Sequence, residues 1–313
     1  MPTPALPLPP PAHQLPIPAA HPRAGGTRLI AGVPYAAVPG IRPLELDLYL
    51  PPESEGPVPV VVFLHGGGWR LGSRHAAGPA YRGASPTPFE QVAQAGVAVA
   101  SVDYRLSGEA TWPAQLHDAK AAVRWLRSRA AELGVDPERI AAWGESAGGH
   151  LAELLGLTAD DAGLEGEVGI TGTSSRVSAV VAWYAPSDIS AVATDNGTDP
   201  DDATSREAQL LGAPAPDVPE LAAQASPITH VGPDAPPFLL LHGAADRFIP
   251  AVQSERLYDL LVETGIEAEL DLYEDADHMW LGSPEAAQQA LDRTIDVLRR
   301  RLGVRGAARR EED

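Results

Sequence analysis

The sequence contains one serine in a setting that is typical of a catalytic nucleophile. Residues 144–148 match the pattern G-x-S-x-G, in which the glycines allow a sharp turn from a strand into a helix. The apolar residues IAAW precede this motif, and the helical pattern AGGHLAELLGL follows the serine. The positive end of that helix would point at Ser146. This context favours a nucleophile over a plain strand-to-helix turn.

A second motif could supply backbone hydrogen-bond donors. Residues 65–69 read HGGGW and directly follow the apolar run 58–64. Glycines let backbone N–H groups face a cavity without side chains in the way, and donors of this kind stabilise a developing oxyanion by roughly 3–4 kcal/mol each. A glycine run alone more often marks a flexible loop. Beside the serine motif, it predicts an oxyanion hole made by the N–H groups of Gly67, Gly68 and Ala147.

The serine also needs a base and an acid that orients the base. Asp246 and His278 each come just after an expected core strand, so both would lie at the same edge of the sheet as the serine. They follow it in the chain order Ser…Asp…His. Rival acids are Asp188, Asp275 and Asp277, of which the last two are close to the histidine in sequence. We expect Asp246 and His278 to complete a triad.

The remaining histidines do not form a metal-binding pattern. We expect His65 to brace the glycine loop, His242 to pack at a strand end, and His117 and His150 to be surface or packed residues on helices. No H-E-x-x-H pattern, P-loop or G-x-G-x-x-G fingerprint is present. The sequence therefore predicts no metal site and no cofactor.

The elements that must position these residues alternate between strands and helices. This pattern predicts an α/β fold, with a mostly parallel central sheet and helices on both faces. Strands are expected at residues 27–35, 44–50, 58–64, 97–102, 139–143, 177–183, 237–241 and 267–273. Helices are expected at residues 89–95, 114–133, 147–157, 252–264 and 284–302, with two short ones at 205–211 and 218–225.

The chain divides into an arm, one domain and a tail. Residues 1–25 are rich in proline and predict an extended arm without a hydrogen-bond ladder, residues 26–304 form the α/β domain, and residues 305–313 form a charged tail. Residues 184–236 are too long for a simple connection and predict a small lid, although a surface excursion is the alternative. The acidic stretch 194–203 lacks the EF-hand spacing that calcium would require.

Composition excludes several classes of protein. The 313 residues carry a net charge of −19, which disfavours binding to nucleic acid or to anionic membranes. The absence of cysteine excludes disulfides, thiolate catalysis and iron–sulfur clusters. Lys120 is the only lysine, so it is the one candidate for a Schiff base, and it lies on a helix expected to be exposed. No signal peptide or membrane-spanning run is evident, which favours a cytoplasmic protein.

The chain resembles the hormone-sensitive-lipase-like, BD-FAE-like carboxylesterases of the α/β-hydrolase superfamily. The stretches VVVFLHGGGWRLGSR, VASVDYRL, WGESAGGHLA, FLLLHGAADRFIP and YEDADHMW carry this resemblance, in family order, over most of residues 58–281. It implies that Ser146 attacks an acyl carbonyl, that His278 relays the proton and that Asp246 holds the imidazole. It also implies an oxyanion hole at Gly67, Gly68 and Ala147.

We therefore expect a serine carboxylesterase that acts on a small-molecule ester with a short acyl or an aryl group. Alternatives are an arylformamidase or other amidase with the same triad, a sugar deacetylase, and a binding module without activity. Trp69, Met279 and Trp280 flank the predicted site and could line an apolar pocket, or could belong to the core. The sequence predicts neither a nucleic-acid nor a membrane partner, and it leaves a homodimer open.

Overall fold

The chain folds around one large β-sheet. The computed structural model describes residues 11–304 except residues 53, 55 and 160. In this part of the chain the sheet has nine strands in the order β1-β2-β3-β5-β4-β6-β7-β8-β9. The first three neighbouring pairs, β1-β2, β2-β3 and β3-β5, are antiparallel. The five pairs that follow, from β5-β4 to β8-β9, are parallel. The strands are β1 (His21–Pro22), β2 (Arg28–Ala36), β3 (Leu44–Leu50), β4 (Val58–Leu64), β5 (Ala98–Val102), β6 (Val135–Glu145), β7 (Val180–Trp183), β8 (Phe238–Gly243) and β9 (Ala268–Tyr273).

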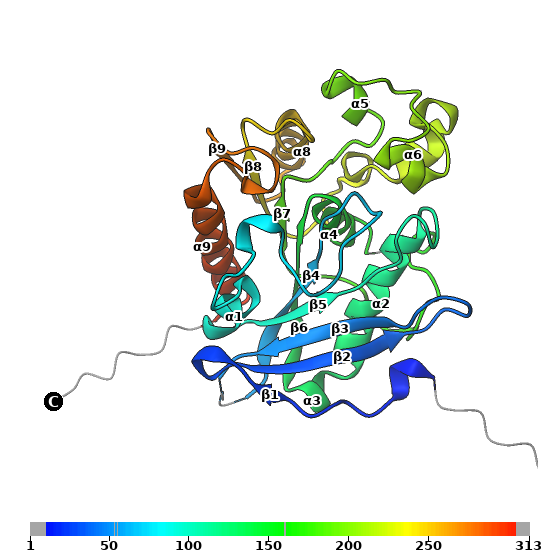
Figure 1. The fold of residues 1–313 in the computed structure, drawn as a ribbon. Helices are drawn as coiled ribbons and strands as arrows, with labels where there is room; N and C mark the ends of the chain where they lie inside the picture. Colours follow the sequence, from blue (N-terminus) through cyan, green and yellow to red (C-terminus); the bar gives the residue numbers. More distant parts are fainter. Residues whose placement is uncertain (1–10, 53, 55, 160, 305–313) are drawn as a thin grey trace, which may run out of the picture.

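Helices cover both faces of the sheet, so the predicted α/β architecture is confirmed (Figure 1). One face is covered by α1 (Pro88–Gln94) and α9 (Pro284–Arg301). The other face is covered by α2 (Ala114–Ser128), α4 (Ala147–Leu157) and α8 (Val252–Glu263). None of the helices in the described part of the chain is long and apolar enough to cross a lipid bilayer.

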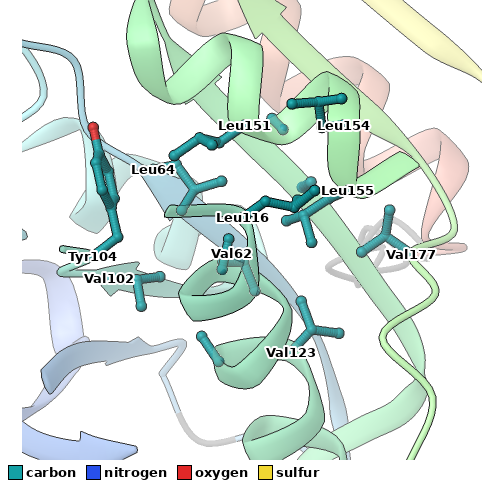
Figure 2. Packing of buried hydrophobic residues seen from close by; sticks show 14 of the residues in the cluster. Val62, Leu64, Val102, Tyr104, Leu116, Val123, Leu151, Leu154, Leu155 and Val177 are labelled. Carbon is teal, nitrogen blue, oxygen red and sulfur yellow. The ribbon is translucent and has the colours of Figure 1, made fainter. Parts of the chain in front are cut away.

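Strand β4 shows how the sequence divides the core between the two faces. Successive side chains of a strand point to opposite faces of the sheet. Val62 and Leu64 accordingly belong to the cluster beneath α2 and α4 (Figure 2), whereas Val61 and Phe63 belong to the cluster beneath α1 and α9. The continuous apolar run 58–64 is therefore buried on both sides, as expected for a central parallel strand.

Two element boundaries differ from the prediction by more than three residues, and the others shift by three residues or fewer. The expected helix 114–133 is interrupted, so that α2 ends at Ser128 and a short α3 (Ala130–Leu133) follows it before the left-handed Gly134. Strand β6 begins at Val135, four residues earlier than predicted, because Val135 pairs with Val58 of the neighbouring strand. The first part of this strand contains charged residues and a proline, so its pattern alone did not indicate a strand.

The N-terminal arm is attached to the domain over its described residues. A short 3-10 turn, η1 (Ala12–Gln14), lies against the end of α2, where the indole N–H of Trp125 donates to the carbonyl oxygen of His13 at 3.1 Å. β1 then adds a two-residue antiparallel ladder to β2. The expectation of an arm without any ladder was therefore wrong at His21–Pro22. Residues 1–10 and the predicted tail 305–313 lie outside the described residues.

The predicted lid, residues 184–236, consists of short helices and turns. It contains α5 (Val192–Asp195), α6 (Arg206–Leu211), η4 (Ala215–Asp217), α7 (Pro219–Gln224) and η5 (Pro227–His230). Figure 1 shows α5 and α6 together in a lobe at the upper right, beyond α4. This segment thus leaves the sheet after β7 and returns to it at β8.

Lys120 is buried, which corrects the expectation of an exposed helix. Its side chain is 0% exposed, and its Nζ donates to the carbonyl oxygen of Thr158 at 2.6 Å and forms an ion pair with Glu165 at 3.2 Å. Burial lowers the pKa of Lys120 and the nearby carboxylate of Glu165 opposes this shift. Helix α2 is covered on several sides, so the amphipathic pattern underestimated its burial.

Candidate active site

The nucleophile candidate lies at a strained turn between β6 and α4. Ser146 adopts a φ of 52°, in the left-handed region that residues with a side chain rarely occupy. The turn is possible because of two glycines. A Cβ on Gly144 would lie 2.1 Å from the carbonyl oxygen of Gly148, and a Cβ on Gly148 would lie 2.0 Å from that of Leu64. The serine hydroxyl is consequently presented at the N-terminus of α4.

The structure brings together the serine, histidine and aspartate that the sequence analysis selected. The Ser146 hydroxyl donates to Nε2 of His278 at 2.9 Å. The opposite ring nitrogen, Nδ1, donates to the Asp246 carboxylate at 2.6 Å. The two partners come from the turns after β8 and β9, at the carboxyl edge of the sheet. This is the geometry of a nucleophile, a base and an orienting acid.

The rival acids are engaged elsewhere or lie in solvent. Asp277 pairs with Arg247 and caps the backbone N–H of His278. Asp188 faces Arg256 at 3.7 Å. Asp275 is exposed. None of these three carboxylates bonds to the histidine ring.

Asp246 is held as a carboxylate by several donors. One oxygen accepts from the backbone N–H groups of Phe248 and Ile249, both at 2.8 Å. The other oxygen faces the rings of His278 and, at 3.3 Å, His242. Burial alone would raise the pKa of Asp246, but the hydrogen bonds from His242 and His278 outweigh it and hold the pKa below its usual range.

The glycine loop faces the same hydroxyl. Gly67 and Gly68 have φ values of 121° and 59°, in the left-handed region, and both residues line the cavity that also contains Ser146. The hydrogen bonds of the described residues leave the N–H groups of Gly67, Gly68 and Ala147 without an acceptor. Such free, fixed donors are what an oxyanion requires. A Cβ on Gly67 would lie 2.1 Å from the Leu71 carbonyl oxygen, which explains the glycine there.

A buried carboxyl group supports this loop from below. Glu145 accepts from the backbone N–H of Gly66 at 3.2 Å and from the hydroxyl of Tyr184 at 2.9 Å. The Tyr184 ring also contacts the ring of His278, with centroids 4.8 Å apart. Burial raises the pKa of Glu145 to about 7, although both hydrogen bonds oppose this shift.

The His65 ring fixes the beginning of the same loop. It stacks on Tyr104 at 4.3 Å, and its Nδ1 donates to the carbonyl oxygen of Gly66 at 2.8 Å. The Tyr104 hydroxyl in turn donates to the His65 carbonyl oxygen at 2.8 Å. Burial lowers the pKa of His65 to about 4, so the ring is neutral near pH 7. The expected bracing role of His65 agrees with these contacts.

A cavity of about 660 Å³ opens above the serine. Trp69 and Met279 line it, although Trp69 is 1% exposed and also belongs to the core cluster beneath α2 and α4. Trp280 does not line it, which corrects the expectation that it could: its side chain is 1% exposed and packs against aromatic rings that include Tyr184 and Trp183. In the turn after β9, Met279 thus lines the cavity and the neighbouring Trp280 packs in the core.

Comparison with known proteins gives the family. The BD-FAE family model matches residues 46–261, more than half of the chain. The chain belongs to the BD-FAE family. The match includes the glycine loop, the serine turn and Asp246, and it ends before His278.

Curated relatives of this BD-FAE chain are esterases. It is 31% identical over 252 residues to the probable carboxylic ester hydrolase LipM of Mycobacterium tuberculosis, a match that covers 79% of this chain and 56% of LipM. It is 35% identical over 205 residues to Esterase LipC of the same organism, covering 66% of this chain and 48% of LipC. The chain spans about half the length of the curated relatives it matches.

Solved structures of esterases resemble the BD-FAE chain over most of its length. A truncated carbohydrate esterase from gut microbiota superposes with a TM-score of 0.78 at 30% identity, covering 90% of this chain and 99% of that one. A propionate-bound thermophilic esterase, Est2 of Thermogutta terrifontis, gives a TM-score of 0.71 at 27% identity, covering 92% and 98%. The α/β-hydrolase fold that the sequence resemblance implied is therefore confirmed.

Sequence reasoning missed His242 and Glu145 as members of the BD-FAE site. His242 was expected only to pack, yet its Nε2 lies 3.3 Å from the triad carboxylate and 2.9 Å from the Ile249 carbonyl oxygen. Its position four residues before Asp246 was the available signal. Glu145 is the variable position of the G-x-S-x-G pattern, so the motif itself says nothing about its role.

The BD-FAE chain offers no metal site in its described part. Among these residues, no group of three histidine, aspartate or glutamate side chains could hold a metal ion. In the acidic stretch 194–203, Asp195 pairs with Arg256, and Asp199 and Asp202 accept from nearby backbone N–H groups.

Proposed function

We propose that this chain is a serine carboxylesterase that hydrolyses short-acyl or aryl esters through an acyl-enzyme intermediate. One observation carries the proposal: the Ser146 hydroxyl, the His278 ring and the Asp246 carboxylate form a continuous line of hydrogen bonds of 2.9 and 2.6 Å. This line opens into a cavity that is also lined by Gly67, Gly68 and Ala147, whose backbone N–H groups have no acceptor among the described residues.

In the acylation step, Ser146 Oγ attacks the ester carbonyl carbon while its proton moves to Nε2 of His278. The carbonyl oxygen becomes an oxyanion and receives hydrogen bonds from Gly67, Gly68 and Ala147, which would stabilise it by roughly 3 kcal/mol per donor. The imidazolium then protonates the departing alcohol oxygen. The Asp246 carboxylate stabilises the charged ring and fixes its tautomer.

In the deacylation step, water takes the place of the alcohol. The neutral ring of His278 removes a proton from the water, whose oxygen attacks the acyl carbon of the Ser146 ester. The same N–H groups hold the second oxyanion, and its collapse breaks the bond between the acyl carbon and Ser146 Oγ. The oxygen of the serine takes the proton back from the His278 imidazolium, and the acid is released. The same triad thus serves both steps.

The cavity and the comparisons support a small acyl group. The related Est2 structure is described as propionate-bound, which favours a short acyl group, and the cavity of about 660 Å³ has the size of an ordinary small-molecule pocket. A sugar deacetylase is the second candidate, because the structurally similar gut-microbiota protein is a carbohydrate esterase. An amidase would use the same triad, and no observation favours it over an esterase.

We further propose that residues 184–236 act as a cap on the site. Four residues of this segment line the cavity, namely Tyr184, Pro186, Arg206 and Glu207. A cytoplasmic location and a homodimer stay predictions of the sequence, which cell fractionation and light scattering would test.

The decisive experiment is a rate series on aryl acetate, butyrate, octanoate and palmitate, with N-formylkynurenine and acetylated xylo-oligosaccharides beside them. The wild type and Ser146→Ala are measured together. A serine-dependent maximum at acetate or butyrate is expected. A higher kcat/KM on the formamide or on the acetylated sugar would move the assignment to that alternative, and activity that survives Ser146→Ala would refute the mechanism.

A further inference from the structure

The cavity is unexpectedly rich in positive charge for an acidic protein. The chain has a net charge of −19, yet Arg70, Arg82 and Arg206 all line the cavity, against the two carboxyl groups of Glu145 and Glu207. The Glu145 carboxyl is already bonded below the glycine loop. Arg70 and Arg82 are exposed at the cavity surface, whereas Arg206 is half-buried.

Arg206 connects the two sides of the reaction centre. Its side chain lies on the oxyanion loop, since a Cβ on Gly68 would come within 2.6 Å of Arg206 Cδ. Its guanidinium carbon lies 5.1 Å from the centre of the Phe248 ring, over which it stacks. The Phe248 ring in turn contacts the His278 ring, with centroids 5.7 Å apart. Arg206 therefore lies directly against the loop that carries the proposed oxyanion donors, and it is separated from the His278 ring by the Phe248 ring.

The guanidinium of Arg206 has N–H donors that no acceptor among the described residues occupies. Among the described residues it has no hydrogen-bond acceptor and no carboxylate within ion-pair distance, and its ring contact with Phe248 leaves its N–H groups free. Glu207 lines the same cavity and forms no ion pair with Arg206, although burial raises the pKa of Glu207 and the charges of Arg206 and Arg70 oppose this rise. Arg105, by contrast, is fully engaged by Asp118 and a backbone carbonyl. A half-buried guanidinium without an acceptor is suited to an anionic ligand.

We infer that Arg206 binds a carboxylate on the alcohol part of the substrate, an inference that rests on the proposed esterase function. The departing alcohol oxygen must face Nε2 of His278 to receive its proton. Groups attached to that oxygen then pass Phe248, which covers one side of the ring, and reach Arg206. The planar guanidinium fork matches a carboxylate in a bidentate manner. The substrate class is thus an ester of a hydroxy acid.

The test compares two esters that differ in charge at one position, 4-acetoxybenzoate and 4-acetoxybenzamide. The ratio of their kcat/KM values is measured for the wild type, Arg206→Gln and Arg206→Lys. The wild type is expected to favour the benzoate, although the net negative charge of the protein repels it. Arg206→Gln should lower the ratio about tenfold, and Arg206→Lys should lower it less because it keeps the charge without the fork. Arg300→Gln, at the end of α9 away from the cavity, is the matched control and should keep the wild-type ratio.

Product inhibition of the wild type provides a second measurement that does not depend on a folded variant. Free 4-hydroxybenzoate should inhibit hydrolysis of the benzamide ester more strongly than 4-hydroxybenzamide does, because only the former carries the carboxylate that the guanidinium fork matches. A wild-type preference for the benzamide, or an unchanged ratio in Arg206→Gln, would overturn the inference. Hydrolysis of both esters that persists in Ser146→Ala would instead refute the esterase mechanism, so the two failures are distinguishable.

Discussion

Ser146 has no special reactivity of its own, because a free hydroxyl is a weak nucleophile near neutral pH. Its neighbours supply what it lacks. The His278 ring accepts a hydrogen bond from its hydroxyl at 2.9 Å, the turn holds its backbone at a φ of 52°, and α4 begins at the next residue. At the scale of single residues, function depends on contacts that come from three separate loops.

Replacing Ser146 by alanine should remove almost all turnover. The substitution deletes only the attacking oxygen, so we expect kcat on an aryl acetate to fall by about four orders of magnitude or more while the far-UV circular dichroism spectrum stays the same. Ser190→Ala, at an exposed serine outside the cavity, should behave as the wild type. A fluorophosphonate probe should label the wild type and fail to label Ser146→Ala. Labelling of the variant would place the nucleophile elsewhere.

Replacing Asp246 by asparagine should slow the reaction and leave binding nearly unchanged. The amide cannot hold the His278 tautomer or stabilise the imidazolium, so we expect kcat to fall by about 10³–10⁴-fold with a small change in KM. Asp188→Asn is the control, since Asp188 lies near Arg256 and not near the ring. A larger loss in the control than in Asp246→Asn would show that the acid is misassigned.

The triad could be predicted because each member follows a recognisable strand or motif. What the sequence could not indicate is which neighbour a side chain meets. Trp280 and Met279 are adjacent and both apolar, and only the packing of Trp280 against Tyr184 and Trp183 decides that Met279 faces the cavity. In the same way, the contact of His242 with Asp246 depends on how the chain turns after β8.

At the scale of elements, the site depends on the close approach of α4 to β4. Gly148 lies where this helix crosses the end of the strand, and a Cβ there would meet the carbonyl oxygens of Leu64 and His65 at 2.0 and 2.5 Å. Backbone atoms cannot move aside as a flexible side chain can. If residue 148 carried a Cβ, α4 and the serine turn would have to move away from the end of β4 and the glycine loop.

Gly148→Ala should therefore impair both stability and activity. We expect a loss of about 1–3 kcal/mol in the free energy of unfolding, measured by urea denaturation, and a large loss of kcat, since the serine turn moves relative to the oxyanion donors. Gly108→Ala is the matched control, because a methyl group at that position would meet no atom within 4 Å and the φ of Gly108 is not positive. Equal effects of the two substitutions would contradict this account.

Element types were predictable where periodicity is strong, as in α9 and in the buried strand β4. The boundaries of the elements were less predictable, because pairing with a neighbouring strand decides where a strand begins and ends. β6 gains its first four residues from the pairing of Val135 with Val58, and β1 exists only because β2 offers a free edge. The order of the strands in the sheet could not be predicted either, since the hydrophobic periodicity of a strand does not indicate which strands lie beside it.

At the scale of the whole molecule, the site places an ionisable carboxyl group in the protein interior. Glu145 is 4% exposed, and burial raises its pKa from an ordinary value of 4.5 to about 7. The folded protein therefore holds a proton on Glu145 between about pH 4.5 and 7 that the unfolded chain has released. Stability falls with rising pH wherever the folded state binds more protons.

Glu145→Gln should remove this dependence, because glutamine resembles the protonated acid and can still bond to Tyr184 and to the Gly66 N–H. We expect the wild type to lose about 3 kcal/mol of unfolding free energy relative to the variant as the pH rises from about 4.5 to 7, with the other buried groups cancelling in the difference. Urea denaturation at each pH gives both curves. Glu138→Gln, at an exposed glutamate, should run parallel to the wild type. A difference between the wild type and Glu145→Gln that stays constant with pH would mean that Glu145 is ionised throughout, and that the loop is held by a full negative charge.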